Sequence, residues 1–147
     1  CRKMDENNNH LILCQDSKDW REQLYVSYHH LGIKHGIPMA TIEIHEELLQ
    51  YYVEQLPVDS SDYDIKYRTA ILHQKRIRWD QWFRGRIASS WKPLYQTSVN
   101  PKSHQHNLYI LIHHTAEHWQ DLWHHRNNIV HRITTTEQQQ KKKHRVN

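Results

Sequence analysis

The sequence predicts an all-α protein, with about five helices in an irregular bundle and a disordered basic C-terminal tail. Only 3 Gly and 4 Pro occur among 147 residues, so the tight turns that join β-strands have few residues to use. Apolar residues recur at helical spacing in five segments, and no segment reads convincingly as a strand. Hydrophobic residues make up 37% of the chain, which predicts a thin core where the 6 Trp and 8 Tyr supply much of the buried area.

The first two predicted helices lie in the N-terminal half of the chain. The segment DSKDWREQLYVSYHHLG begins at an N-cap, Asp16 or Ser17, and ends at Gly32. The segment TIEIHEELLQYYVEQLP is capped by Thr41 and stops before Pro57. The residues expected to face the core are Trp20, Leu24, Tyr28 and Leu31 in the first helix, and Leu48, Leu49, Tyr52, Val53 and Leu56 in the second.

Two further helices are predicted in the middle of the chain. The third runs from about Ile65 toward Phe83, and Gly85 is the expected break. The segment IASSWKPLYQTSV predicts a shorter fourth helix. Pro93 fits its first turn, because the missing N–H has no partner there in any case.

The last predicted helix runs from about Leu108 to about His131. The segment TTTEQQQKKKHRVN follows it and has almost no apolar residues, which predicts disorder. The chain therefore divides into a truncated Cys/His zinc-type segment, a helical domain and a disordered basic tail, at residues 1–15, 16–133 and 134–147.

Charge is distributed unevenly along the chain and points to a polyanionic partner. Residues 1–62 hold five Lys or Arg and eleven Asp or Glu, a net charge of −6, whereas residues 63–147 hold fifteen and five, a net charge of +10. A solvated helix face with a basic tail would show the same imbalance. Aromatic residues interleave the basic ones, which favours a nucleic acid, either RNA or DNA, as the partner.

The basic residues concentrate between Lys66 and Lys92, where Asp80 is the only acid among eight Lys and Arg. Arginine suits phosphate best because its planar guanidinium donates two parallel hydrogen bonds. Trp79 and Trp82 lie among these residues, but their spacing with Phe83 is that of a helix's buried stripe, so we expect both to be core residues. The candidate nucleic-acid contacts are Arg76, Arg78, Arg84, Arg86 and Lys92, with Lys141, Lys142 and Lys143 of the tail.

The sequence contains no stretch of about 18 apolar residues and no signal peptide, so no membrane partner is expected. These absences favour an intracellular location, in the cytoplasm or nucleus. The first residue is Cys, which suggests a fragment or a processed product.

The N-terminal segment carries potential metal ligands. His10 and Cys14 are four residues apart, so one helical turn would bring both side chains to one face. Thiolate and imidazole suit tetrahedral zinc, but a structural site takes four ligands and only Cys1, His10 and Cys14 are present. Cys1 is then interpreted as the second member of an interrupted Cys-x-x-Cys pair. The alternative is two unrelated cysteines, one of them a small buried apolar residue.

Three segments, in order, resemble the part of eukaryotic retrotransposon reverse-transcriptase polyproteins that lies downstream of the polymerase. The cysteines and His10 resemble its zinc-binding segment, which is followed by an apolar helix with a Trp, here Trp20. The segment IRWDQWFRGRIASSW resembles a second region, with Arg78 in place of the usual Gly and Ala88 in place of the usual Ser. The segment LWHHRNNIVH is similar to the Leu-Trp-x-x-Arg-Asn ending. The matching residues of the second region are Ile77, Trp79, Trp82, Gly85, Ile87 and Trp91.

The resemblance covers nearly the whole chain and implies an accessory domain. The polymerase carboxylates and any endonuclease would lie upstream, so this chain would itself be non-catalytic. It implies binding to nucleic acid or a structural role, the rest of the polyprotein as a partner, and zinc as a possible cofactor at an incomplete site.

The segment LWHHRNNIVH also supports an alternative function. Arg126 falls within the apolar stripe of the last helix, where a charge needs a partner such as Asp80 or Asp121, or a helix-end carbonyl. Arg126 with His131 also resembles the Arg-x4-His motif of the HEPN family, all-α domains of which many are metal-independent ribonucleases. That resemblance implies that Arg126 stabilises charge on the phosphate and that His131 assists proton transfer, with Asn127 beside them.

Helix geometry argues against this alternative, because five residues turn His131 about 140° away from Arg126. Asn127 and His131 share a face, so the motif would need the helix to unwind near Asn127, or two chains to pool their sites. A purely structural helical module with no ligand is the third possibility.

Overall fold

The all-α class is confirmed by a computed structural model that describes the backbone of residues 8–95 and 103–146 and the side chains of residues 10–95 and 105–128. Helices and connecting loops account for all of the described backbone, and none of it is a strand. The elements are α1 (Asn8–Leu13), η1 (Gln15–Ser17), α2 (Lys18–His35), α3 (Met39–Val53), η2 (Ser60–Asp62), α4 (Ile65–Ile77), α5 (Trp79–Trp82), η3 (Ser89–Tyr95) and α6 (Ser103–Val146), where η marks a short 3₁₀ helix.

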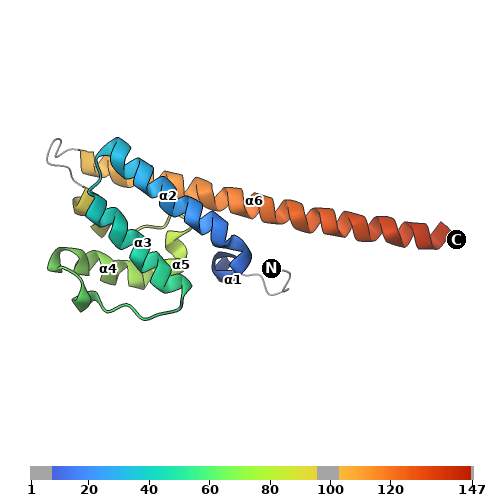
Figure 1. Cartoon of the computed structure of the whole chain (residues 1–147), viewed down its shortest axis with the longest axis horizontal. Helices are drawn as coiled ribbons and strands as arrows, with labels where there is room; N and C mark the ends of the chain where they lie inside the picture. The colour runs from blue at the N-terminus through green and yellow to red at the C-terminus, as the bar shows by residue number, and fades with distance from the viewer. Residues whose placement is uncertain (1–7, 96–102, 147) are drawn as a thin grey trace.

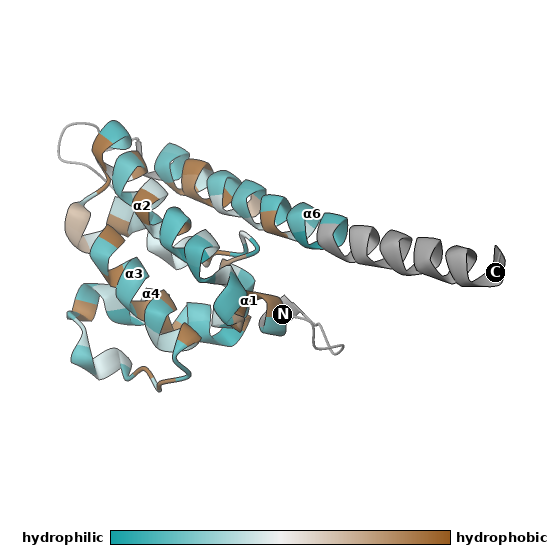
Figure 2. Ribbon diagram, turned by 45° about the vertical axis from the view of Figure 1, so that its right-hand side comes forward, coloured by the Kyte–Doolittle hydropathy of each residue, from teal (hydrophilic) through white to brown (hydrophobic). Residues whose placement is uncertain are grey.

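The helices pack in layers, with α2 between α6 on one side and α3 on the other, and with α4 beyond α3 (Figure 1). The short α5 contacts α1, α3 and α4, and η3 contacts both α4 and α6. Hydrophilic residues cover most of the ribbon of α2 and of the described part of α6, and hydrophobic residues occur in separate turns (Figure 2). Such a pattern is expected where each helix buries only a narrow stripe.

The predicted end of the first helix is wrong. The helix α2 continues past Gly32 to His35, and Gly36 terminates it in the left-handed conformation at φ 70°. Gly32 is instead a contact residue, because a Cβ there would lie 3.2 Å from the Ile42 side chain of α3. The absence of a side chain at Gly32 therefore sets how closely α2 and α3 approach.

The helix α3 begins after Pro38 rather than at a Thr41 cap. Thr41 is buried and its hydroxyl donates to the Leu94 carbonyl at 3.2 Å, so it joins α3 to η3. Leu48 and Leu49 are fully buried as predicted, but Leu56 lies beyond the helix and is 49% exposed.

The third predicted helix is divided in two. The helix α4 ends at Ile77, Arg78 takes a positive φ of 90°, and α5 begins at Trp79. Gly85 also has a positive φ, 89°, and lies so close to α6 that an added Cβ would be 2.9 Å from the Ala116 Cβ. The chain therefore does turn at Gly85 as expected, but an earlier break at Arg78 already ends α4.

The helix α6 is longer than predicted and reaches Val146. Its distal part extends away from the other helices (Figure 1). The structure thus differs from the disordered tail expected from residue 134. Glu, Gln and Lys, which make up half of that segment, have high helix propensity, and extending an existing helix adds one hydrogen bond per residue without a new nucleation step.

A core of aromatic rings and paired polar groups lies between these helices. Trp82 and Trp91 are fully buried, and they flank His45 with ring centroids at 4.7 and 4.5 Å. The His45 Nε2 lies 2.8 Å from the Tyr95 hydroxyl, which provides this buried imidazole with a hydrogen bond. In a second pairing, Trp82 Nε1 donates to the Tyr28 hydroxyl at 3.2 Å, and that hydroxyl also bonds Thr115 of α6.

Candidate nucleic-acid interface

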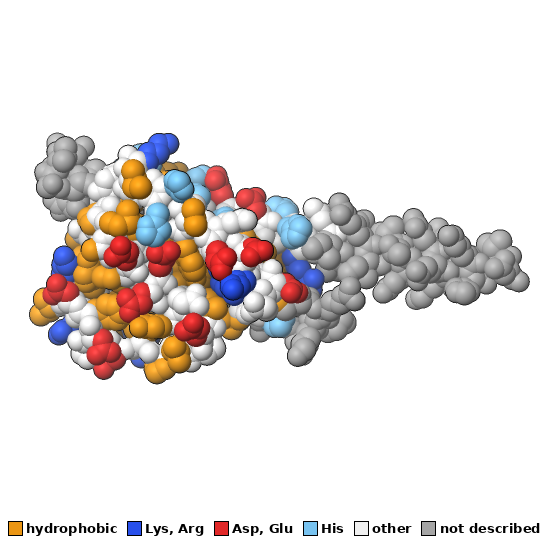
Figure 3. All heavy atoms as spheres, viewed as in Figure 1, with side chains coloured by type: hydrophobic (Ala, Val, Ile, Leu, Met, Phe, Trp, Pro, Cys, Tyr) orange, Lys and Arg blue, Asp and Glu red, His pale blue; other side chains and the backbone are white. Residues whose placement is uncertain are grey.

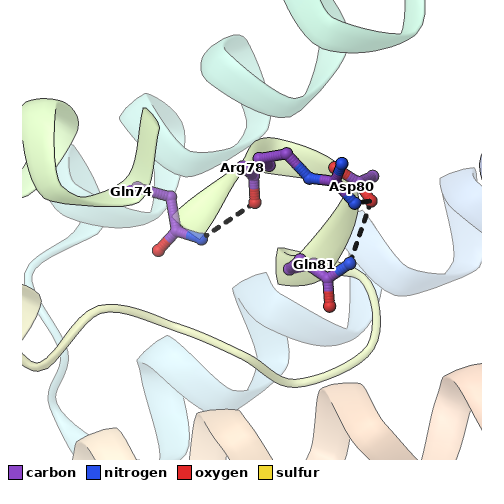
Figure 4. A network of polar contacts seen from close by, with 4 residues as sticks. All are labelled: Gln74, Arg78, Asp80 and Gln81. Atoms are coloured by element: carbon purple, nitrogen blue, oxygen red, sulfur yellow. Dashed lines mark hydrogen bonds and ion pairs between the residues drawn. The ribbon is translucent and has the colours of Figure 1, made fainter. Parts of the chain in front are cut away.

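The candidate interface is organised by Gln74, a fully buried residue near the end of α4. Its Nε2 donates to the Arg78 carbonyl at 3.4 Å (Figure 4). The same Nε2 donates to the Arg86 carbonyl at 3.0 Å, and the Gln74 Oε1 accepts from the Ala88 N–H at 2.8 Å. One side chain thus holds the end of α4 against residues 86–88. The backbones of Arg78 and Arg86, eight residues apart in sequence, consequently lie beside each other.

Asp80, the only acid between Lys66 and Lys92, is neutralised locally. Its Oδ2 accepts from Arg78 Nη2 at 3.1 Å and from Gln81 Nε2 at 3.0 Å (Figure 4). The Asp80 side chain is 7% exposed, whereas that of Arg78 is 65% exposed. Asp80 is therefore removed from the surface, while the guanidinium that pairs with it remains accessible to a ligand.

The other candidate residues differ in exposure. Arg76 and Arg86 are exposed, and Arg84 and Lys92 are half-buried. Among the described residues no ion pair engages Arg76, Arg84 or Arg86. Arg84 and Arg86 flank Gly85 and its close contact with α6. No described contact connects Arg84 or Lys92 to the cluster around Gln74, so the structure brings together Arg78 and Arg86, with Arg76 in the same last turn of α4. The side chains of Lys141, Lys142 and Lys143 lie outside the described residues.

The tryptophans of this region are core residues, as predicted. Trp82 is fully buried and Trp79 is 9% exposed. Trp91 is also fully buried. Trp82 and Trp91 therefore have no face free for a ligand, and only Trp79 reaches a surface hollow.

Acidic side chains are spread over the face that carries α2 and α3 (Figure 3). This face includes much of the acidic N-terminal half of the sequence. Phosphate would be repelled there. The candidate residues Arg76 and Arg78 lie instead at the C-terminal end of α4.

The sequence did not indicate the hollow beside this junction. It has a volume of about 440 Å³ and combines residues from α3, the following loop, α4 and α5: Tyr52, Gln55, Leu56, Pro57, Val58, Lys75 and Trp79. No sequence motif marks this set, because its members come together only through the packing of α3 on α4 and α5.

Of the three proposed zinc ligands, the structure describes His10 and Cys14. His10 lies in α1 and its carbonyl accepts from the Cys14 N–H at 2.9 Å, which confirms that one helical turn separates them. Cys14 is buried, with 5% of its surface exposed. Cys1 lies outside the described residues, and among those described no three His, Cys, Asp or Glu side chains gather at a metal-binding distance.

The residues of the alternative nuclease site lie on an unbroken helix. Arg126 is half-buried and Asn127 is exposed, and the backbone stays helical through residue 131. A continuous helix rotates position 131 about 140° from position 126 about its axis. The His131 side chain lies outside the described residues. Asp80, one of the carboxylates expected to pair with Arg126, is bonded to Arg78 instead.

Trp123, on the turn of α6 before Arg126, is 39% exposed. Trp119 lies one turn before Trp123 on α6, and its ring centroid is 6.2 Å from that of Trp20 in α2. Trp123 stacks on Trp119 at 6.3 Å, at the edge of the core.

Comparison of the chain with models of protein families, with curated proteins and with solved structures finds no match. In the part of the chain that the structure describes, no helix is both long and apolar enough to span a membrane.

Proposed function

We propose that this chain is a non-catalytic, nucleic-acid-binding accessory domain of a retroelement reverse-transcriptase polyprotein. Its main phosphate contacts are Arg76, Arg78 and Arg86. The observation that carries the proposal is the junction of α4 and α5, where Gln74 joins Arg78 to Arg86. Asp80, the only acid in the sequence between Lys66 and Lys92, is already paired there.

The backbone at two positions supports the retroelement resemblance. Arg78 stands where the similar proteins have Gly, and its φ of 90° with ψ of 143° is a conformation that Gly adopts without strain. Gly85, a matching position, has φ 89° and no room for a Cβ beside Ala116. Both positions at which the similar proteins have Gly thus have a positive φ, which favours glycine.

Salt dependence of binding tests the proposal. The purified chain is titrated with a fluorescein-labelled 20-nucleotide strand and the matching duplex, in DNA and RNA, between about 50 and 200 mM salt. The expected log–log slope is about −0.7 to −0.9 per phosphate neutralised, with little sequence preference.

A pair of matched double variants locates the contacts. Arg76→Gln/Arg86→Gln should weaken binding and reduce the slope by about 0.7 to 0.9 per arginine. Lys18→Gln/Lys34→Gln removes the same charge from α2 and should change much less. Salt-independent affinity, no binding at about 50 mM salt, or equal losses in both variants would contradict the proposal.

A further inference from the structure

The hollow beside the α4–α5 junction has the chemistry of a site for a flat ring. Tyr52 and Trp79 contribute aromatic rings, and Leu56, Pro57 and Val58 contribute apolar walls. Its volume of about 440 Å³ falls within the range of about 300–1,000 Å³ for small-ligand sites. A planar heteroaromatic group could therefore enter and stack on the accessible parts of the two rings.

Positive charge borders the hollow on the side of the arginines. Lys75 lines it from the last turns of α4 and is exposed. Burial raises the pKa of the Tyr52 hydroxyl to about 12, and the charges of Asp80 and Arg78 act on it as well. Arg78, whose side chain is 65% exposed, directly precedes the lining residue Trp79 in the chain.

The opposite side of the hollow repels phosphate. The loop residues Leu56, Pro57 and Val58 also line a second hollow of about 590 Å³. Four acidic residues line that second hollow: Glu47, Asp59, Asp62 and Asp64. A polyanion entering the first hollow would therefore run from Lys75 toward Arg78 and away from the loop.

We propose that this hollow receives one unpaired nucleobase of a single strand, stacked against Tyr52 and Trp79, while Lys75 and Arg78 hold the flanking phosphates. The inference rests on the proposed function and narrows it, because bases inside a duplex are already stacked and cannot enter. Base stacking on aromatic side chains tolerates any sequence, so no base preference is required.

The first test uses the unaltered chain with three probes of one length at one salt concentration: a mixed-sequence single strand, its duplex, and a strand of abasic sites. The single strand should bind about ten-fold more tightly than either of the others, the size expected of one stacked base. An abasic strand that binds as well as the natural single strand overturns the inference.

The second test compares two neighbouring tyrosines of α3. Tyr52→Leu should lower single-strand affinity about ten-fold and leave duplex affinity unchanged. Tyr51→Leu is the matched control, because Tyr51 lines the acidic hollow instead, and it should change neither affinity. Equal effects of the two variants overturn the inference, and the abasic comparison still decides if Tyr52→Leu does not fold.

The two proposals fail in distinguishable ways. If binding is salt-dependent but equal for the single strand, the duplex and the abasic strand, the nucleobase site is wrong and the phosphate interface stands. If none of the three probes binds, both proposals are wrong.

Discussion

Among single residues, Arg78 shows the largest conflict between residue type and backbone. A φ of 90° is unfavourable for any residue with a Cβ, and such positions cost about 1–3 kcal/mol. Contacts on both of its backbone groups hold Arg78 there: its N–H donates to the Gln74 carbonyl at 2.7 Å, and its own carbonyl accepts from Gln74 Nε2. Strain of this kind persists where surrounding contacts over-determine the conformation, and here it places an arginine at the candidate interface.

Two substitutions at Arg78 separate the strain from the ion pair. Arg78→Ala and Arg78→Gly both remove the bond to Asp80, but only glycine relaxes the positive φ. The Gly variant should therefore be more stable than the Ala variant by about 1 kcal/mol, measured by chemical denaturation. Equal stabilities, or a more stable Ala variant, would show that the backbone at position 78 carries no strain.

At the scale of elements, histidine side chains join α2 to α6. The His118 Nε2 donates to the Trp20 carbonyl at 2.8 Å, and Trp20 Nε1 donates in return to the His118 carbonyl at 2.7 Å. The two rings stack with centroids 4.9 Å apart, and one turn earlier His114 Nε2 lies 2.7 Å from the Ser27 hydroxyl. His114 and His118, four residues apart on α6, thus both contact α2.

Replacing His118 and His113 with Ala should have unequal effects. His118→Ala removes a hydrogen bond and a ring contact in the seam, and should lower the free energy of unfolding by about 1–2 kcal/mol. His113→Ala alters a side chain that is 60% exposed, so the change should stay within about 0.5 kcal/mol. Equal changes in the two unfolding free energies would mean that the seam does not hold α2 to α6.

For the molecule as a whole, the buried polar core links stability to pH. Burial lowers the pKa of His45 to about 3, because the fully enclosed ring cannot be hydrated when charged. In the unfolded chain the pKa returns to about 6.5. Between pH 3 and pH 6.5 the His45 imidazole binds a proton in the unfolded state but stays neutral in the folded state. The free energy of unfolding is therefore fully retained above about pH 6.5 and falls as the pH drops.

His45→Gln measures this contribution. Between pH 7.5 and pH 5.0 the unaltered chain should lose about 2 kcal/mol through His45, at 1.36 kcal/mol per pH unit below about 6.5. The variant should lose correspondingly less over the same interval, even if it is less stable at every pH. Burial also lowers the pKa of His114, but that group is present in both proteins and cancels in the comparison. Parallel stability–pH curves for the two proteins would contradict the assignment.

The residues whose roles depend on local spacing were predictable from sequence. The scarcity of Gly and Pro and the recurring apolar positions predicted the all-α class. The i, i+3 and i+4 spacing of Trp79, Trp82 and Phe83 predicted their burial. The arginines of the candidate interface were predictable as a charged segment, because composition alone shows one acid among eight basic residues.

The tertiary structure decided what depends on contacts between distant segments. Helix α4 ends at Ile77 before reaching Gly85, because Gln74 bonds to residues 86–88, and no local pattern reveals that bond. The bonds from Gln74 also bring the backbones of Arg78 and Arg86, two of the eight basic residues of the segment, beside each other. The hollow beside them joins Tyr52 of α3 to Lys75 of α4 and Trp79 of α5, and only the packing of these helices could create it. Spacing within a helix follows from backbone geometry, whereas the faces that meet follow from the lowest free energy of the whole chain.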